Sequence, residues 1–274
     1  MQVIKEYVKE QKEILKKKIV TFNSKPIFYI IQIGDVDASN RYVRNKIKDC
    51  DEVGIKTELF KLPKSVSKEE LKCLIDAFND NDNSIDAVMV QFPLPEHLNE
   101  KEVMSWINPK KDADGFTNNG ITNPATPKGI ITYLERNSYD FENKNALVIG
   151  RSEIVGKPMA RLLLEKNSNV TVIHSKTSAD KKQEFINNAD LIICATGHIN
   201  TLDTTMFPNI DMAYKKVIFD VGINFDGNGK LVGDCEPMLP VPFQSPVPGG
   251  VGLLTRLQLL ENIVKLYEER GNSN

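Results

Sequence analysis

The chain has 274 residues, of which 41% are hydrophobic and 26% charged, and its formal net charge is −2. This length suits two domains with substantial apolar cores, and the balanced charge argues against nucleic acid as a partner. The longest apolar runs are strand-sized and charged residues stand close to Met1, so we expect neither a membrane span nor a signal peptide.

Cysteine and histidine usage indicates the compartment and argues against a metal site. The four cysteines are far apart in the sequence and the three histidines show no ligand spacing. Free thiols are typical of a reducing cytoplasm, and a structural zinc site needs closely spaced ligands. We therefore expect a cytoplasmic protein without a metal ion.

The first half of the chain begins with two predicted helices. Residues 3–20 carry an apolar stripe at helical spacing among lysines and glutamates. Residues 37–53 predict a second helix, with Asp37 or Ser39 as its N-cap and Gly54 as its end.

Strands and a further helix complete this half. Ser67 and Glu70 form a capping box that predicts a helix ending near Asn79. The prolines of Phe92-Pro-Leu-Pro95 prevent a continued strand and predict a rigid loop. The expected strands are residues 27–33, 55–62 and 85–91.

Three polar residues of this half are candidates for chemistry. Tyr42 and Lys46 are four residues apart, so they share one face of the predicted helix. A phenol beside an ammonium group in a partly desolvated cleft can lower the lysine pKa enough for proton transfer near neutrality. Gln91 stands at the end of a strand. A surface lysine and a solvated strand end are the alternative interpretations.

The segment after these strands offers two carboxylates and a hinge. Asp112 and Asp114 precede Gly115, a pattern that is also typical of a simple turn. Residues 117–128 contain asparagines, a glycine and prolines, which indicate a hinge. We predict a substrate domain over residues 1–118 and a dinucleotide-binding domain over residues 119–252.

The second half contains a phosphate-binding turn. Residues 146–149 are continuously apolar, as in a buried parallel strand, and are followed by Gly150-Arg-Ser-Glu-Ile-Val-Gly156. A helix that starts near Val155 would direct its unpaired amides towards a pyrophosphate. The spacing departs from the usual Gly-x-Gly-x-x-Gly, so an ordinary turn between strand and helix is the alternative.

Further apolar runs extend the predicted parallel sheet. They cover residues 169–174, 189–197 and 216–222, and their ends place Thr196 and Gly197 at the expected cofactor edge. Ser175-Lys-Thr177 stands where an NAD-specific fold would carry an acidic residue, and Arg151 lies in the first turn. This combination suits a 2′-phosphate, so NADP is favoured over NAD.

The end of the chain combines turns with a long helix. Residues 226–229 predict a hairpin turn. Pro246-Val-Pro-Gly-Gly-Val-Gly252 predicts a rigid loop whose backbone can approach a flat ligand. A helix over residues 253–266 is expected to return to the N-terminal half, and the predicted helical tail extends to residue 274.

The motifs together resemble one family over essentially the whole chain, the bifunctional methylenetetrahydrofolate dehydrogenase/methenyltetrahydrofolate cyclohydrolases. The resemblance rests on seven segments in the family's order and spacing: Ser39-Asn-Arg-Tyr-Val-Arg-Asn-Lys46, Val90-Gln-Phe-Pro-Leu-Pro95, Lys111-Asp-Ala-Asp-Gly115, Pro124-Ala-Thr-Pro-Lys-Gly129, Gly150-Arg-Ser-Glu-Ile-Val-Gly-Lys-Pro158, Asp220-Val-Gly-Ile-Asn224 and Pro246-Val-Pro-Gly-Gly-Val-Gly252. It implies an α/β fold with a β-α-β substrate domain and a doubly wound Rossmann-type nucleotide domain.

The resemblance also implies roles for particular residues. Lys46 matches the catalytic lysine, Tyr42 lines the same cleft, and Gln91 matches the glutamine that hydrogen-bonds the lysine. Asp114 matches the aspartate that holds the pterin ring. The other matching positions are Pro93, Gly249 and Gly250 for the folate, and Gly150, Arg151, Ser152, Ser175, Ile223, Thr196 and Gly197 for NADP.

The implied chemistry is NADP-dependent oxidation of 5,10-methylenetetrahydrofolate followed by hydrolysis to 10-formyltetrahydrofolate, by a homodimer in one-carbon metabolism that supplies purine biosynthesis. Two positions depart from the family pattern. Ala125 replaces a usual cysteine, and Leu253 and Leu254 replace Pro-Met after the glycine loop.

Three alternatives remain open on the sequence. A dehydrogenase without hydrolase activity would lack Lys46. A catalytically silent dinucleotide-binding regulator would not need Tyr42, Lys46 and Gln91. A different NADP dehydrogenase of similar plan would lack the Pro-Leu-Pro and Pro-Gly-Gly loops.

Overall fold

The computed structural model describes residues 1–80, 84–117 and 120–271, and the chain divides into two compact units. The three-stranded unit comprises residues 9–125 and 256–274, and the five-stranded unit comprises residues 1–8 and 126–255. The predicted domain boundary at residues 118 and 119, and the last three residues of the predicted C-terminal helix, lie outside the described residues.

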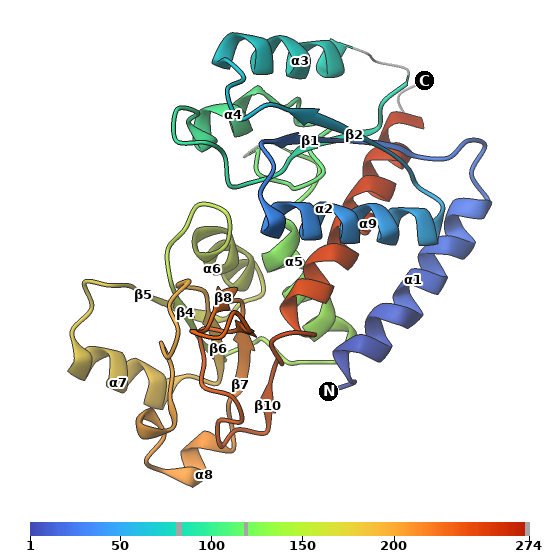
Figure 1. The fold of residues 1–274 in the computed structure, drawn as a ribbon. Helices are drawn as coiled ribbons and strands as arrows, with labels where there is room; N and C mark the ends of the chain where they lie inside the picture. The colour runs from blue at the N-terminus through green and yellow to red at the C-terminus, as the bar shows by residue number, and fades with distance from the viewer. Residues whose placement is uncertain (81–83, 118–119, 272–274) are drawn as a thin grey trace. The chain divides into compact units, whose positions relative to one another are not determined.

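The three-stranded unit is built on a parallel sheet with the strand order β2-β1-β3. Figure 1 labels β1 and β2 of this sheet. Its strands are β1 (Ile27–Ile33), β2 (Lys56–Leu62) and β3 (Ala87–Val90). The prediction for β1 is confirmed residue for residue, whereas β3 is shorter than predicted. Two parallel neighbours on either side of an apolar β1 require crossover connections, which α2 and α3 supply.

The two faces of this sheet carry different side chains. Ile31, Val88 and Val90 belong to an apolar cluster with residues of α3 (Lys68–Asp80) and α4 (Glu100–Trp106). Successive side chains of a strand point to opposite faces. Met89 and the residue after β3, Gln91, therefore face the other side of the sheet.

The helices of this unit match the predictions, with corrections at the ends. Helix α1 covers Ile4–Val20 and α2 covers Asp37–Val53, and Gly54 ends α2 in the left-handed conformation as predicted. The predicted N-cap of α2 is wrong: Val36 is the cap and no side chain caps the helix. Asp37 instead lies inside the first turn, where its charge favours the helix dipole.

The capping box of α3 is confirmed. The Glu70 carboxylate accepts from the backbone N–H of Ser67 at 2.9 Å, and the Ser67 hydroxyl accepts from the backbone N–H of Glu70 at 3.2 Å. Two otherwise unpaired donors at the helix start are thereby satisfied.

Helix α9 (Val251–Gly271) begins two residues earlier than predicted, so Leu253 belongs to its first turn. Its later residues pack in the three-stranded unit, as predicted: the Asn262 side chain donates to the Ala113 carbonyl at 2.8 Å, and Lys265 donates to the Ile121 carbonyl at 2.7 Å. The end of the predicted hinge is instead helical, because α5 covers Ala125–Arg136. Pro127 fits its first turn, where the N–H has no helical partner.

The five-stranded unit contains an all-parallel sheet with the order β10-β7-β6-β4-β5 (Figure 1). Its strands are β4 (Asn145–Ile149), β5 (Asn169–Ile173), β6 (Leu191–Cys194), β7 (Val217–Asp220) and β10 (Phe243–Gln244). Four of them were predicted, and β10 was not. The chain leaves β4 for β5 on one side and later adds β6 on the other, so the strand order reverses at β4, which is where doubly wound sheets bind ligands.

The remaining elements of this unit surround that sheet. Helix α6 (Gly156–Glu165) starts next to Val155 as predicted and packs against β4 and β5. The predicted turn at residues 226–229 joins the antiparallel strands β8 (Asn224–Phe225) and β9 (Leu231–Val232). Short elements that the periodicity did not reveal are α7 (Ala179–Asn188), η1 (Thr204–Met206) and α8 (Ile210–Ala213).

None of the helices in the described part of the chain is both long enough and apolar enough to span a membrane.

Candidate functional site

The Lys46 side chain extends from α2 to Gln91, the residue that follows β3. The Lys46 Nζ donates to Gln91 Oε1 at 3.1 Å and contacts Met89 Sδ at 3.5 Å. The Gln91 amide nitrogen donates to the Phe92 carbonyl at 2.6 Å, which turns the Gln91 carbonyl oxygen towards the lysine. The strand alternation that faces Met89 and Gln91 towards α2 thus creates an acceptor for a partly buried ammonium group.

The charges around Lys46 are strongly coupled. Burial lowers the pKa of Lys46, and the nearby Asp114 carboxylate opposes this shift. Burial raises the pKa of Asp114 to about 6, and Lys46 opposes that shift in turn. Such displaced pKa values favour proton exchange near neutrality.

Tyr42 lies one helical turn before Lys46 on α2 and is half-buried. Burial raises the pKa of its phenol, and Arg41 opposes the shift. The phenol is therefore protonated at neutral pH and is available as a hydrogen-bond donor.

Asp112 and Asp114 have different roles in their loop. The buried Asp112 carboxylate accepts from the backbone N–H groups of Gly115 at 2.9 Å and Thr117 at 2.7 Å, so Asp112 forms the turn. Gly115 has a φ of +74°, and a Cβ there would lie 2.2 Å from the Asn123 backbone. This fixed loop leaves the partly exposed Asp114 beside Lys46.

The other residues predicted to bind the folate are not part of the Lys46, Gln91 and Asp114 cluster. Pro93 lies exposed two residues beyond Gln91, in the loop that follows β3. Gly249 and Gly250 belong to the five-stranded unit, and a Cβ on Gly250 would lie 2.4 Å from the Pro246 carbonyl oxygen.

The glycine turn after β4 is shaped for close backbone approach. Gly150 has a φ of +123°, and a Cβ there would lie 2.1 Å from the Ala195 carbonyl oxygen. A Cβ on Gly156 would lie 2.5 Å from the Gly150 carbonyl oxygen. Both positions exclude any larger residue, so the turn can bring a helix N-terminus to a dinucleotide phosphate.

The predicted cofactor residues are arranged around this turn. The Ser152 hydroxyl accepts from the N–H groups of Val155 at 3.2 Å and Gly156 at 3.3 Å, so it caps the start of α6. Arg151 is exposed beside it. Ser175 is exposed two residues after the end of β5, which is the neighbour of β4 in the sheet. A cation and a hydroxyl at this edge fit a 2′-phosphate.

The buried carboxylate of Asp234, which the sequence analysis missed, holds the loop after β6 at the same edge of the sheet, on the other side of β4 from Ser175. Asp234 Oδ2 accepts from the backbone N–H groups of Thr196 at 2.6 Å and Gly197 at 3.0 Å. These two amides are therefore already engaged. Ile223 is exposed in the neighbouring loop after β7. A Gly-Asp pair after a short strand was the only sequence signal for Asp234.

These features define a class of protein: an α/β enzyme with a doubly wound dinucleotide unit and a second β-α-β unit that carries a partly buried lysine hydrogen-bonded to a glutamine. Two family models match the chain, namely "Tetrahydrofolate dehydrogenase/cyclohydrolase, catalytic domain" over residues 2–114 and "Tetrahydrofolate dehydrogenase/cyclohydrolase, NAD(P)-binding domain" over residues 124–271. The chain belongs to the tetrahydrofolate dehydrogenase/cyclohydrolase family.

Individual relatives agree with this assignment. The chain is 43% identical to the bifunctional protein FolD of Streptococcus agalactiae over 86% of this chain and 84% of the relative. The crystal structure of the bifunctional FolD enzyme of Campylobacter jejuni matches with a TM-score of 0.85 and 36% identity, over 97% of this chain and 95% of that chain.

A further solved structure is the methylenetetrahydrofolate dehydrogenase-cyclohydrolase of Trypanosoma brucei, complexed with NADP cofactor and inhibitor. It matches with a TM-score of 0.88 and 25% identity, over 98% of this chain and 97% of that chain. The chain is thus an enzyme of one-carbon metabolism, a bifunctional dehydrogenase and cyclohydrolase that acts on tetrahydrofolate derivatives with an NAD(P) cofactor.

Proposed function

We propose that the chain oxidises 5,10-methylenetetrahydrofolate with NADP+ and hydrolyses the resulting 5,10-methenyltetrahydrofolate to 10-formyltetrahydrofolate. The observation that carries this proposal is the partly buried Lys46 ammonium group, which is hydrogen-bonded to Gln91 and interacts electrostatically with Asp114. A dehydrogenase without hydrolase activity has no use for such a group, because hydride transfer from a methylene bridge needs no strong acid or base.

The proposed division of roles follows the two units. The three-stranded unit binds the folate: Asp114 accepts from the amino and ring N–H groups of the pterin, and Tyr42 and Pro93 line the same cleft. The resemblance also assigns Gly249 and Gly250 to the folate, and these two residues belong to the five-stranded unit. In this proposal the three-stranded unit takes the role of the predicted substrate domain, and the five-stranded unit takes the role of the predicted dinucleotide-binding domain.

For the hydrolysis, Lys46 carries the proton traffic. Water adds to the methenyl carbon and loses a proton. The ring then opens by cleavage of a carbon–nitrogen bond, and the leaving nitrogen takes up a proton. Lys46 can hold and release that proton because burial lowers its pKa. Gln91 fixes the ammonium position through its carbonyl oxygen, and Tyr42 supplies a nearby phenol.

The five-stranded unit holds the cofactor. The NADP+ cofactor, when bound, accepts the hydride. Gly150 and Ser152 shape the turn for its pyrophosphate, and Arg151 and Ser175 contact the 2′-phosphate. Thr196, Gly197 and Ile223 lie on the nicotinamide side of the turn, and the narrow cradle at Gly150 and Gly156 supports this placement.

The first experiment separates the two activities. Lys46→Met should reduce methenyltetrahydrofolate hydrolysis by about a hundredfold or more, because general acid–base catalysis is typically worth that much. It should retain hydride transfer, measured as NADPH formation, so that the methenyl product accumulates. Lys48→Met, which changes an exposed lysine of the same helix, is the control and should leave both rates unchanged. Equal loss of both activities in Lys46→Met would contradict the assigned role.

We further propose a homodimer. The edge strand β5 has a neighbour on one side only within the described sheet, and the nearby Val172 and Leu164 are 40% and 60% exposed. An open edge beside exposed aliphatic side chains favours association. Light scattering should give the mass of a dimer, and Val172→Lys should shift it towards the monomer. Val20→Lys in α1, also exposed, should not; a monomeric wild type would contradict the proposal.

We also propose that the enzyme acts in the cytoplasm and supplies formyl groups for purine biosynthesis. Four free cysteines, of which Cys50, Cys194 and Cys235 are buried, support a reducing compartment.

A further inference from the structure

A pair of buried carboxylates connects the loops at the carboxyl edge of the five-stranded sheet. Asp234 follows β9 and is fully buried, and Asp220 is the last residue of β7 and is also buried. Fully buried carboxylates are rare unless every oxygen is hydrogen-bonded, because an unpaired buried charge is costly.

The Oδ2 atom of Asp234 holds the loop after β6. It accepts from the N–H groups of Thr196 and Gly197 and, at 3.1 Å, from the Thr196 hydroxyl. Three donors converge on one carboxylate oxygen, and hydrogen bonds to a charged acceptor are stronger than neutral ones. The backbone of this loop is therefore fixed by a residue almost forty positions later in the chain.

The Oδ1 atom of the same carboxylate holds the loop after β7. It accepts from the Asn224 side chain at 2.9 Å, and a Cβ on Gly222 would lie 2.2 Å from it. Gly222 and Asn224 are the neighbours of Ile223. One carboxylate thus contacts both sides of the exposed Ile223 and also the loop at Thr196.

Asp220 fixes Asp234 in turn. Its Oδ1 accepts from the backbone N–H groups of Asp234 and Gly222, both at 2.9 Å, and its Oδ2 accepts from the N–H of Cys235 at 2.9 Å. A Cβ on Gly233 would lie 1.9 Å from Asp220 Oδ2. Gly233, next to Asp234, leaves the space that the Asp220 carboxylate occupies, and Gly222, two residues after Asp220, leaves the space that the Asp234 carboxylate occupies.

The position of these loops decides what they can hold. Ser175 follows β5 on one side of β4, whereas the loops at Thr196 and Ile223 follow β6 and β7 on the other side. A dinucleotide whose pyrophosphate binds at the turn after β4 extends its adenosine towards β5 and its nicotinamide towards β6 and β7. Asp234 consequently sets the spacing of the two loops on the nicotinamide side only.

We infer that Asp234 is a positioning residue for the nicotinamide half of the cofactor, acting through the loops at Thr196 and Ile223. The inference rests on the proposed use of NADP. It also implies that Thr196 and Gly197 contact the cofactor through groups other than their backbone N–H, since those donors belong to Asp234.

The test is Asp234→Asn, measured by calorimetric binding of two ligands to the full-length protein. Asparagine has the same shape as aspartate, but one of its two terminal groups is an NH2 donor. This NH2 group would face other donors, either the backbone N–H groups of Thr196 and Gly197 or the side-chain amide of Asn224. The affinity for NADP+ should fall at least about tenfold, the equivalent of one charged hydrogen bond. The affinity for adenosine 2′,5′-bisphosphate, which lacks the nicotinamide half, should stay within about twofold.

Two controls separate positioning from loss of structure. Asp226→Asn removes a carboxylate from the turn of the same hairpin, where it holds only the N–H groups of Asn228 and Lys230, and should leave both affinities unchanged. Hydrolysis of methenyltetrahydrofolate without cofactor should persist in Asp234→Asn. If that variant fails to fold, Asn224→Ala removes one contact of Asp234, and a selective loss of NADP+ affinity there supports the same inference.

The outcomes distinguish this inference from the proposed function. Unchanged NADP+ binding in Asp234→Asn, or an equal loss for NADP+ and adenosine 2′,5′-bisphosphate, would overturn the positioning role. A wild-type protein that binds neither ligand would instead overturn the proposed use of NADP, and the inference with it.

Discussion

The chemistry at the residue scale depends on charges that the fold withdraws from water. Lys46 and Asp114 are each displaced from their ordinary pKa by burial, and each partly restores the charged form of the other. Gln91 adds a neutral acceptor that stabilises the ammonium group without fixing its protonation state.

Asp114 makes the stability of the protein pH-dependent in a predictable direction. Its pKa is raised from 3.8 to about 6, so the folded state binds this proton more readily than the unfolded state. The stabilisation is complete below the ordinary pKa and is lost as the pH rises through about 6. Between pH 7.5 and pH 4 the wild type should gain about 2.4 kcal/mol of unfolding free energy relative to Asp114→Asn.

Urea unfolding of both proteins at several pH values in this range measures the difference. A difference that does not change with pH would show that the Asp114 carboxyl is not held in a disfavoured charged state.

At the scale of elements, the β4–turn–α6 unit carries the cofactor turn. A Cβ atom on either of its two glycines would clash with a different backbone group. On Gly150 it would clash with the carbonyl of Ala195, in the loop after β6, and on Gly156 with the carbonyl of Gly150. The start of α6 therefore lies so close to the turn that only glycine, which has no side chain, fits at position 156.

Gly156→Ala should open this turn. The added methyl group would lie 2.5 Å from the Gly150 carbonyl oxygen and 2.7 Å from Arg151 Cα, both backbone atoms. We expect a loss of about 1–3 kcal/mol of unfolding free energy from overpacking, together with at least about tenfold weaker NADP+ binding, because the helix amides move away from the phosphate.

Thermal unfolding and calorimetry measure the two effects. Gly227→Ala is the matched control, since a Cβ there meets nothing within 4 Å. Wild-type affinity in Gly156→Ala would mean that the turn does not bind the pyrophosphate.

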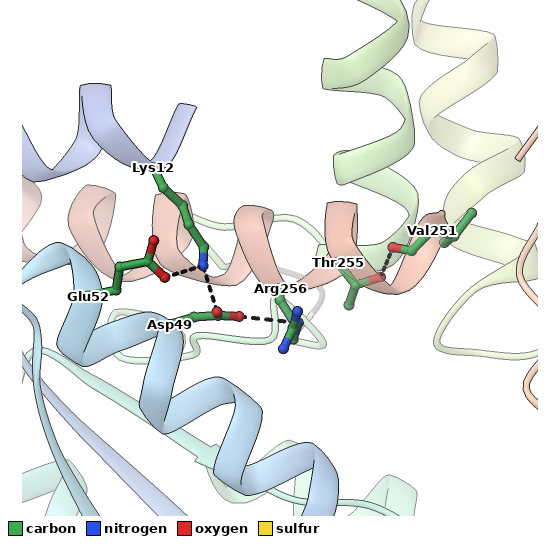
Figure 2. A network of polar contacts seen from close by, with 6 residues as sticks. All are labelled: Lys12, Asp49, Glu52, Val251, Thr255 and Arg256. Atoms are coloured by element: carbon green, nitrogen blue, oxygen red, sulfur yellow. Dashed lines mark hydrogen bonds and ion pairs between the residues drawn. The ribbon is translucent and has the colours of Figure 1, made fainter. Parts of the chain in front are cut away.

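At the scale of the whole molecule, a polar network joins helices from both ends of the chain within the three-stranded unit (Figure 2). The Asp49 carboxylate of α2 pairs with Lys12 of α1 at 2.6 Å and with Arg256 of α9 at 3.2 Å. Lys12 also pairs with Glu52 at 2.7 Å. Helices α1 and α2 and the distant helix α9 thus meet on one buried carboxylate.

Asp49→Ala should cost about 2 kcal/mol of unfolding free energy, because it leaves two largely buried cations without their shared partner. Glu52→Ala is the matched control. The Glu52 side chain is 43% exposed, so its loss should cost less than about 1 kcal/mol. Chemical denaturation measures both, and equal effects would mean that the network has no buried centre.

Much of the fold could be predicted from local patterns. Strand β1, the end of α2 at Gly54, the capping box at Ser67 and the strand–turn–helix at Gly150 all follow from residues within one or two turns of each other. The errors are also local: the N-cap of α2, the limits of β3 and the helix α5 inside a predicted hinge. In each case packing moved an element end that propensity alone left open.

The family, the alternation of helices and strands, and the candidate residues Tyr42, Lys46, Gln91 and Asp114 could all be inferred from the sequence. The strand order β10-β7-β6-β4-β5 and the hydrogen bonds from Lys46 to Gln91 and from Thr196 to Asp234 became visible in the three-dimensional structure. Backbone preferences and capping act over a few residues, and a pattern in the sequence records them. A hydrogen bond between Asp234 and Thr196 exists because the sheet places two distant loops side by side, and no local pattern carries that information.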